Sequence, residues 1–123
     1  MKIKISIGNV SLTANLKDNE TARRIYDALP FDLPYNVWGD EIYFSIPVHL
    51  DIEEGREIVE VGELAYWPPG NAFCIFYGST PASTNERPRA ASAVSPFGKI
   101  EGNVTVLSKI KAGKIQVEKL EER

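Results

Sequence analysis

Apolar and polar residues alternate along the first part of the chain, which predicts a β-hairpin. Ile3, Ile5 and Ile7 alternate with polar residues, and a second alternating run covers residues 10–16. Because successive side chains of a strand point to opposite faces, each run has one buried and one exposed face. The Gly-Asn pair at residues 8–9 fits a two-residue type II′ turn, in which glycine takes the positive φ. This turn pairs apolar residues throughout: Ile7 with Val10, Ile5 with Leu12 and Ile3 with Ala14.

Helical spacing replaces this alternation in the next segment. The apolar residues that recur at this spacing are Ala22, Ile25, Ala28 and Leu29. Asp18 or Asn19 can cap the first turn, because a side-chain oxygen at that position accepts a free backbone N–H. Pro30 lacks an N–H and cannot continue the segment. We therefore predict a short helix that starts at this cap and stops at the proline.

Five further segments have the composition of β-strands. They cover residues 41–46, 59–67, 72–77, 94–100 and 114–120. Residues 72–77 are apolar without interruption, which is typical of a central strand buried on both faces. Residues 103–111 fit either a strand or a helix that ends at residues 112–113, and residues 121–123 are expected to fray. The polar residues 79–89 predict a surface loop.

Many short strands with few helices predict a barrel or a sandwich. The chain has 123 residues, of which 43% are hydrophobic and 25% are charged. This size suits one hydrophobic core, and too little chain follows the polar loop to form a second one. We therefore expect a single domain over residues 1–123.

Charge and cysteine content exclude several classes of function. The net charge is −3 and the basic residues are scattered, so nothing favours binding to nucleic acid or to an anionic membrane. No segment approaches the ~20 apolar residues of a membrane-spanning helix. Cys74 is the only cysteine, which rules out an internal disulfide and points to a reducing compartment. The N-terminal residues do not have the pattern of a signal peptide, so we expect a cytoplasmic protein.

Three segments in the second half of the chain resemble the corresponding part of cyclophilins. They are residues 62–70, 73–81 and 97–102. Residues 38–44, 66–70 and 92–94 resemble more closely a small group of uncharacterised prokaryotic cyclophilin-like proteins, and the resemblance covers nearly the whole chain. It implies a mainly β fold, a closed eight-stranded antiparallel barrel with two short capping helices, one over each end. It also favours the helix for residues 103–111.

The side chains with which cyclophilins isomerise prolyl bonds do not match this sequence. The resemblance places the family's arginine within residues 41–48, which contain no arginine. Ala72 and Cys74 replace the family's glutamine and pocket phenylalanine, and residues 89–94 lack its tryptophan and histidine. Loss of one preorganised donor typically costs about 10²–10³ in rate, so conventional isomerase activity is expected to be absent or residual. A divergent peptidyl-prolyl isomerase is the alternative.

The resemblance and the strand pattern together predict a ligand groove on the outside of the barrel. Its proposed members are Glu41, Tyr43, Trp67, Pro68, Cys74, Arg87 and Arg89, the two arginines reaching it from their loop. The period of two turns Tyr43 and Trp67 away from the core, although surface packing explains them equally well. Glu41 could act as an acid, a base or a hydrogen-bond anchor, but a turn residue is the favoured interpretation. Cys74 has apolar neighbours, which favours a buried inert thiol over a reactive one.

The sequence predicts no catalytic residue, no metal site and no cofactor. His49 lies near several carboxylates, but one histidine in an acidic loop over residues 49–57 fits no strong ligand spacing, and a solvated loop is favoured. Three hypotheses follow: a non-catalytic binding module for an extended peptide or a small molecule, a divergent enzyme, or a structural subunit. We favour the binding module, and the oligomeric state stays open.

Overall fold

The computed structural model describes residues 1–110 and 113–120. Its elements are β1 (Lys2–Ile7), β2 (Val10–Leu16), α1 (Glu20–Ala28), β3 (Phe31–Pro34), β4 (Asn36–Val37), β5 (Glu41–Ser45), β6 (Arg56–Ile58), β7 (Glu63–Trp67), the 3₁₀ helix η1 (Pro68–Gly70), β8 (Ala72–Phe76), β9 (Arg89–Glu101), the 3₁₀ helix η2 (Val104–Lys109) and β10 (Lys114–Leu120). The predicted frayed end at residues 121–123 lies outside the described residues, as do residue 111 and the first residue of the predicted stop at 112–113. Within the described part, no helix is long and apolar enough to cross a membrane.

The N-terminal hairpin has the predicted register. Ile7 faces Val10, Ile5 faces Leu12 and Ile3 faces Ala14 across β1 and β2. Gly8 has a φ of 59°, the left-handed backbone region that the turn needs and that glycine adopts without strain. The three isoleucines of β1 are buried, and β1 pairs with β10 along its other edge, so it is an interior strand of the sheet.

Helix α1 begins at one of the two predicted caps. The side chain of Asn19 accepts a hydrogen bond from the N–H of Ala22 at 2.8 Å, and Asp18 stays exposed. A carboxylate oxygen of Glu53 accepts two further hydrogen bonds at this end, from the N–H and the hydroxyl of Thr21. The acidic loop is therefore partly occupied in stabilising the first turn of the helix, where negative charge is favoured.

The sheet is antiparallel and mainly follows the predicted pattern, but it is not closed by hydrogen bonds. Its strand order is β3-β10-β1-β2-β9-β7-β8-β5-β4, with β6 paired to β9 off this path. The two end strands, β3 and β4, are joined through Tyr35, and no strand pair among the described residues links them. The predicted closed barrel is thus not confirmed.

The predicted number of eight strands is wrong, because the described chain contains ten. Strands β4 and β6 have only two and three residues, too few for a period of two to be recognised. The predicted strand over residues 59–67 begins only at Glu63, after a turn. For residues 103–111 the helical alternative is the one observed, as a 3₁₀ helix over η2.

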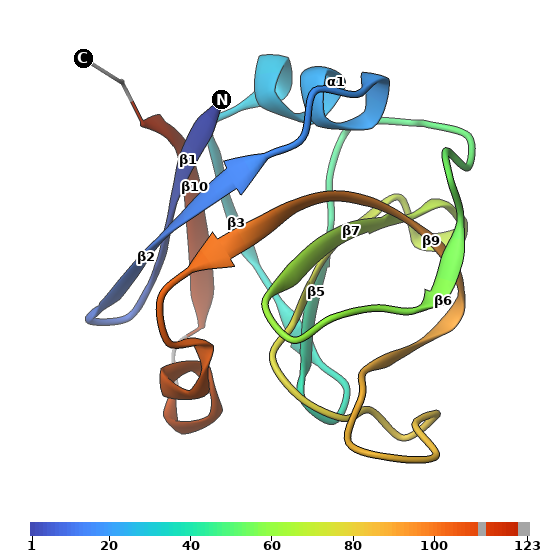
Figure 1. The fold of residues 1–123 in the computed structure, drawn as a ribbon. Helices are drawn as coiled ribbons and strands as arrows, with labels where there is room; N and C mark the ends of the chain where they lie inside the picture. Colours follow the sequence, from blue (N-terminus) through green and yellow to red (C-terminus); the bar gives the residue numbers. More distant parts are fainter. Residues whose placement is uncertain (111–112, 121–123) are drawn as a thin grey trace.

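The interior of the curved sheet holds the main apolar core. Phe44, Phe73 and Phe97 form its aromatic centre, with the rings of Phe44 and Phe73 stacked at 4.9 Å. Helix α1 covers one end of the curved sheet and η2, drawn in orange, lies at the opposite end (Figure 1). The two predicted helices are therefore both present.

A second, smaller apolar cluster lies on the outer face of β5, β7 and β8. Its buried members are Val59, Ala65, Ala72, Cys74, Phe76, Ala90 and Val94, with Tyr43 and Trp67 partly buried against them. The first half of β9 leaves the main sheet, pairs with β6 and covers this face, before its second half pairs with β7. Strand β8 is therefore buried on both faces, as its uninterrupted apolar run predicts.

Candidate functional site

A pocket of about 280 Å³ opens between the outer face of β5 and β7 and the first half of β9. It is lined by Trp38, Glu41, Tyr43, Trp67, Ala90, Ala91 and Val94. Glu41, Tyr43 and Trp67 belong to the predicted groove, and the fold brings them to one place from two different strands. The pocket wall is therefore mostly apolar and aromatic, with one carboxyl group.

A tight turn fixes Trp38 beside Glu41. The N–H of Trp38 donates to the carbonyl of Glu41 at 2.9 Å, and the N–H of Glu41 donates back at 3.2 Å. Gly39 between them has a φ of 61°, and a Cβ there would lie 2.8 Å from Cδ of Pro81 and 2.9 Å from Cα of Thr80. Only glycine suits this position, so the turn is held firmly against the neighbouring loop.

Two contacts orient the ring of Trp67. Its indole Nε1–H donates to the hydroxyl oxygen of Ser92 on β9 at 2.8 Å. On the other side the ring lies close to Gly70, where a Cβ would stand 2.9 Å from Cε3 and Cζ3 of the indole. The Trp-Pro-Pro-Gly sequence at residues 67–70 therefore ends with the one residue that leaves room for the tryptophan ring.

Glu41 is buried without a partner for one of its oxygens. The residue is 6% exposed, and its buried side-chain oxygen Oε1 has no hydrogen-bond partner. Burial raises the pKa of Glu41 to about 7, and a weak hydrogen bond from the thiol of Cys74 to the carboxyl group opposes this rise. No Lys, Arg or His among the described residues forms an ion pair with it.

The other buried glutamate of the chain shows how such a group is normally satisfied. Glu63 is equally buried at 6% exposure. One of its oxygens accepts a hydrogen bond from Arg56 Nη2 at 2.6 Å, and the other accepts one from the N–H of Glu60 at 2.9 Å. Of the described side chains, Glu41 holds the only buried oxygen or nitrogen left unpaired. This contrast makes Glu41 the exceptional group of the site.

Cys74 lies beneath the pocket and does not line it. It stands opposite Tyr43 on β8 and is 1% exposed within the outer apolar cluster. Burial and the neighbouring charge of Glu41 raise the pKa of the thiol well above its usual range. A thiol held neutral and covered in this way is a poor nucleophile.

The other three predicted groove residues lie outside the pocket. Pro68 begins η1 next to Trp67, without lining the cavity. Arg87 is exposed in its loop, and Arg89 forms an ion pair with Glu57 at 3.1 Å. Neither arginine is among the residues that line the pocket.

Sequence reasoning left four lining residues out of the predicted groove. They are Trp38, Ala90, Ala91 and Val94. Trp38 lies in the segment 38–44 that carries the family resemblance, so this signal could have included it. Ala90, Ala91 and Val94 lie within residues 89–94, where the resemblance places one wall of the family's pocket, but their side chains carry no chemical signal of their own.

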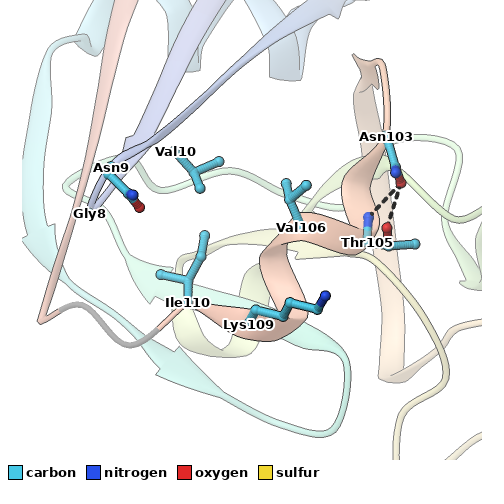
Figure 2. Close-up of a pocket in the computed structure, with 8 residues that line it drawn as sticks. All are labelled: Gly8, Asn9, Val10, Asn103, Thr105, Val106, Lys109 and Ile110. Atoms are coloured by element: carbon cyan, nitrogen blue, oxygen red, sulfur yellow. Dashed lines mark hydrogen bonds between the residues drawn. The ribbon is translucent and has the colours of Figure 1, made fainter.

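A larger hollow of about 470 Å³ lies between the β1–β2 turn and η2 (Figure 2). Figure 2 shows that the side-chain oxygen of Asn103 is already bonded to the N–H and the hydroxyl of Thr105, which caps η2. Among the described residues that line it, Lys109 is the only charged one, and it is exposed. The hollow is therefore larger than the pocket at Glu41, but the described residues that line it include no aromatic ring and no buried charged group.

Two polar side chains of the acidic loop are engaged in contacts with other parts of the fold. His49 Nδ1 lies 3.0 Å from the side-chain oxygen of Asn71, and Glu53 is engaged at the start of α1. Over residues 1–110 and 113–120, no three His, Cys, Asp or Glu side chains converge on a point that could hold a metal ion.

Comparisons with known proteins place the chain in a family. The family model described as Cyclophilin-like matches residues 1–118. A search of curated proteins finds no match. Among solved structures, the chain is similar to the solution structure of a hypothetical protein from Archaeoglobus fulgidus, with 36% identity and a TM-score of 0.81, over 98% of this chain and 95% of that one. The chain therefore belongs to the cyclophilin-like family.

Proposed function

We propose that the protein is a non-catalytic binding module that holds a small molecule in the pocket at Glu41. The observation that carries this proposal is a buried carboxyl oxygen without a partner, in a pocket lined by Trp38, Tyr43 and Trp67. Buried polar groups in folded proteins are almost always hydrogen-bonded, so an unpaired one needs an explanation. A ligand that donates to the carboxyl group of Glu41, which lines the pocket, supplies a partner for it.

The size of the pocket favours a small molecule over an extended peptide. Its volume of about 280 Å³ is at the lower end of ligand pockets, which run from about 300 to 1,000 Å³. Such a volume holds one compact ligand or a single side chain. The pocket is also built on rigid elements, since the turn at Gly39 and the ring of Trp67 are both fixed by close contacts.

A divergent prolyl isomerase is the weaker candidate. Stabilising a twisted amide needs a preorganised donor, and the described residues that line the pocket include no arginine, glutamine or asparagine. In a standard proline-peptide assay we expect turnover no faster than the uncatalysed rate, and the same for Arg87→Ala and Arg89→Ala. Turnover well above background that disappears in either variant would support the isomerase instead.

The two tryptophans provide a direct test of the binding proposal. The chain has two tryptophans and both line the pocket, so their indole N–H signals in NMR report on this site alone. We expect a library of small polar and aromatic molecules to contain compounds that shift both signals in a saturable way. The shift should disappear in Ala91→Leu, which places a larger side chain at an exposed position of the pocket wall.

The control for this experiment is Ala82→Leu, the same substitution in the loop outside the pocket. It should leave the shifts unchanged. If no compound in the library moves either indole signal, the binding proposal is wrong. We further propose that the chain acts as one domain in a reducing, cytoplasmic environment, which the single buried cysteine supports.

A further inference from the structure

We propose that the ligand of this pocket is a small organic cation, an amine or a quaternary ammonium compound, bound by the Glu41 carboxylate and the surrounding aromatic side chains. This inference rests on the proposed function and names the chemical class of the ligand. It follows from the charge of the site, from the side chains that line it and from the space they leave.

No cationic side chain of the described residues compensates the negative charge of Glu41. A buried carboxylate is costly unless a cation or several hydrogen-bond donors compensate it. The charge of Glu63 is compensated by Arg56, whose Nη2 lies 2.6 Å from Oε2 of Glu63. No described cationic side chain pairs with Glu41 in this way. An external cation would give Glu41 the partner that Glu63 already has, and an anionic ligand would be repelled.

Among the described residues, no charged group other than Glu41 lines the pocket. The thiol of Cys74 comes from β8 and the phenol of Tyr43 from β5 itself. Arg89 at the start of β9 forms an ion pair with Glu57. The carboxylate of Asp40 lies against Gly78, because a Cβ added at Gly78 would stand 2.4 Å from Oδ2 of Asp40. The field in the pocket is therefore set by Glu41.

The lining residues suit a cation in a second way. Trp38, Tyr43 and Trp67 are three of the side chains around the carboxyl group. Aromatic rings attract cations through their quadrupole, most strongly tryptophan, and groups of such rings are used to recognise quaternary ammonium ligands. The small side chains of Ala90 and Ala91 on the facing strand leave the space open.

Binding of a cation should be coupled to loss of a proton. The pKa of Glu41 is raised by burial to about 7, so at pH 6 most molecules carry a proton on this carboxyl group. A cation binds the ionised form, and its apparent affinity should rise about tenfold between pH 6 and pH 8, because the ionised fraction rises by that factor. The affinity of a neutral ligand should lack this dependence.

The test compares cations with neutral molecules of the same shape. The first pair is choline and 3,3-dimethyl-1-butanol, and the second is benzylammonium and benzyl alcohol. Each is titrated into the full chain at pH 6 and pH 8, with the two indole N–H signals as the readout. We expect at least one cation to bind at pH 8 at least tenfold more tightly than its neutral partner, and its affinity to fall at pH 6.

Two variants locate the effect. Glu41→Gln keeps the size of the side chain and removes its charge, so it should lower the affinity for the cation at least tenfold and abolish the pH dependence. Glu63→Gln changes the other buried glutamate, which does not line this pocket, and should leave binding unchanged.

The alternative results separate failure of the cation inference from failure of the proposed function. If neutral compounds bind as well as or better than the cations, or if Glu41→Gln binds the cation as tightly as the unmodified chain, the cation inference is overturned while the pocket remains a binding site. If neither cation binds but neutral library compounds do, the same conclusion holds. If nothing moves the indole signals, both the inference and the proposed function fail.

Discussion

Replacing Glu41 with glutamine is expected to raise the free energy of unfolding at pH 8 by about 2 kcal/mol. Burial raises the pKa of this carboxyl group from its ordinary 4.5 to about 7 in the folded protein. The folded state therefore binds the proton more tightly than the unfolded chain does. Below pH 4.5 both states are protonated and the group costs nothing. Between pH 4.5 and 7 only the unfolded chain ionises, so the folded state loses stability relative to it, and the loss is complete once the pH has risen above 7.

The measurement is urea denaturation at pH 5 and pH 8, in the absence of ligand. Glu41→Gln and the unmodified chain should differ little at pH 5 and clearly at pH 8. The matched control is Glu63→Gln, which loses the charge-assisted hydrogen bond from Arg56 and should cost about 1–3 kcal/mol at both pH values. A Glu41→Gln variant that is less stable than the unmodified chain at pH 8 would contradict the unpaired state of this carboxyl group.

This result would also show that keeping Glu41 in the pocket lowers the stability of the folded protein. A chain selected for stability alone has no reason to keep an acidic residue in an apolar pocket, since glutamine or a hydrophobic residue is cheaper there. Sites where a local rule is broken without a structural benefit are often the functional ones. The loss of folding stability at Glu41 is therefore what we expect if this carboxyl group finds its partner only when a ligand is bound.

Truncation of Phe73 to alanine is expected to lower the free energy of unfolding by about 3–5 kcal/mol. Phe73 is completely buried on β8, with its ring stacked on Phe44 at 4.9 Å and edge-on to Phe97 at 5.0 Å. These residues come from three strands, so the cavity left by the ring cannot be filled by one local shift. The loss combines removed apolar burial with lost aromatic contacts.

Urea denaturation at one pH measures this loss, with Val106→Ala as the control. Val106 lies on η2 and is 37% exposed, so its truncation should change the unfolding free energy by no more than about 0.5 kcal/mol. A cost below about 1 kcal/mol for Phe73→Ala would mean that the aromatic cluster does not form the centre of the core.

Local patterns were sufficient to predict several elements of the fold. The β1–β2 hairpin was predictable because its alternation and its Gly-Asn turn lead to the same register. The two-sided burial of β8 follows from an equally local signal, and the cap of α1 was narrowed to Asp18 or Asn19, of which the structure uses Asn19. The short strands β4 and β6 were not predictable, since their pairing depends on distant partners rather than on their own few residues.

The sequence by itself determined which side chains share a face of each strand. The period of two separated Tyr43 from Phe44 and Trp67 from Tyr66, and the structure keeps these pairs on opposite faces of the sheet. This property depends only on the geometry of neighbouring residues, so a single sequence reveals it.

Only the tertiary structure decided which of these outward side chains meet. The first half of β9 crosses the outer face of the sheet and closes the pocket over Glu41, while Arg89 turns to Glu57 instead. It also decided that Glu63 has an arginine and Glu41 has none. The physical reason is that charge pairing and burial depend on contacts between strands far apart in the chain, which the local hydrophobic pattern does not specify.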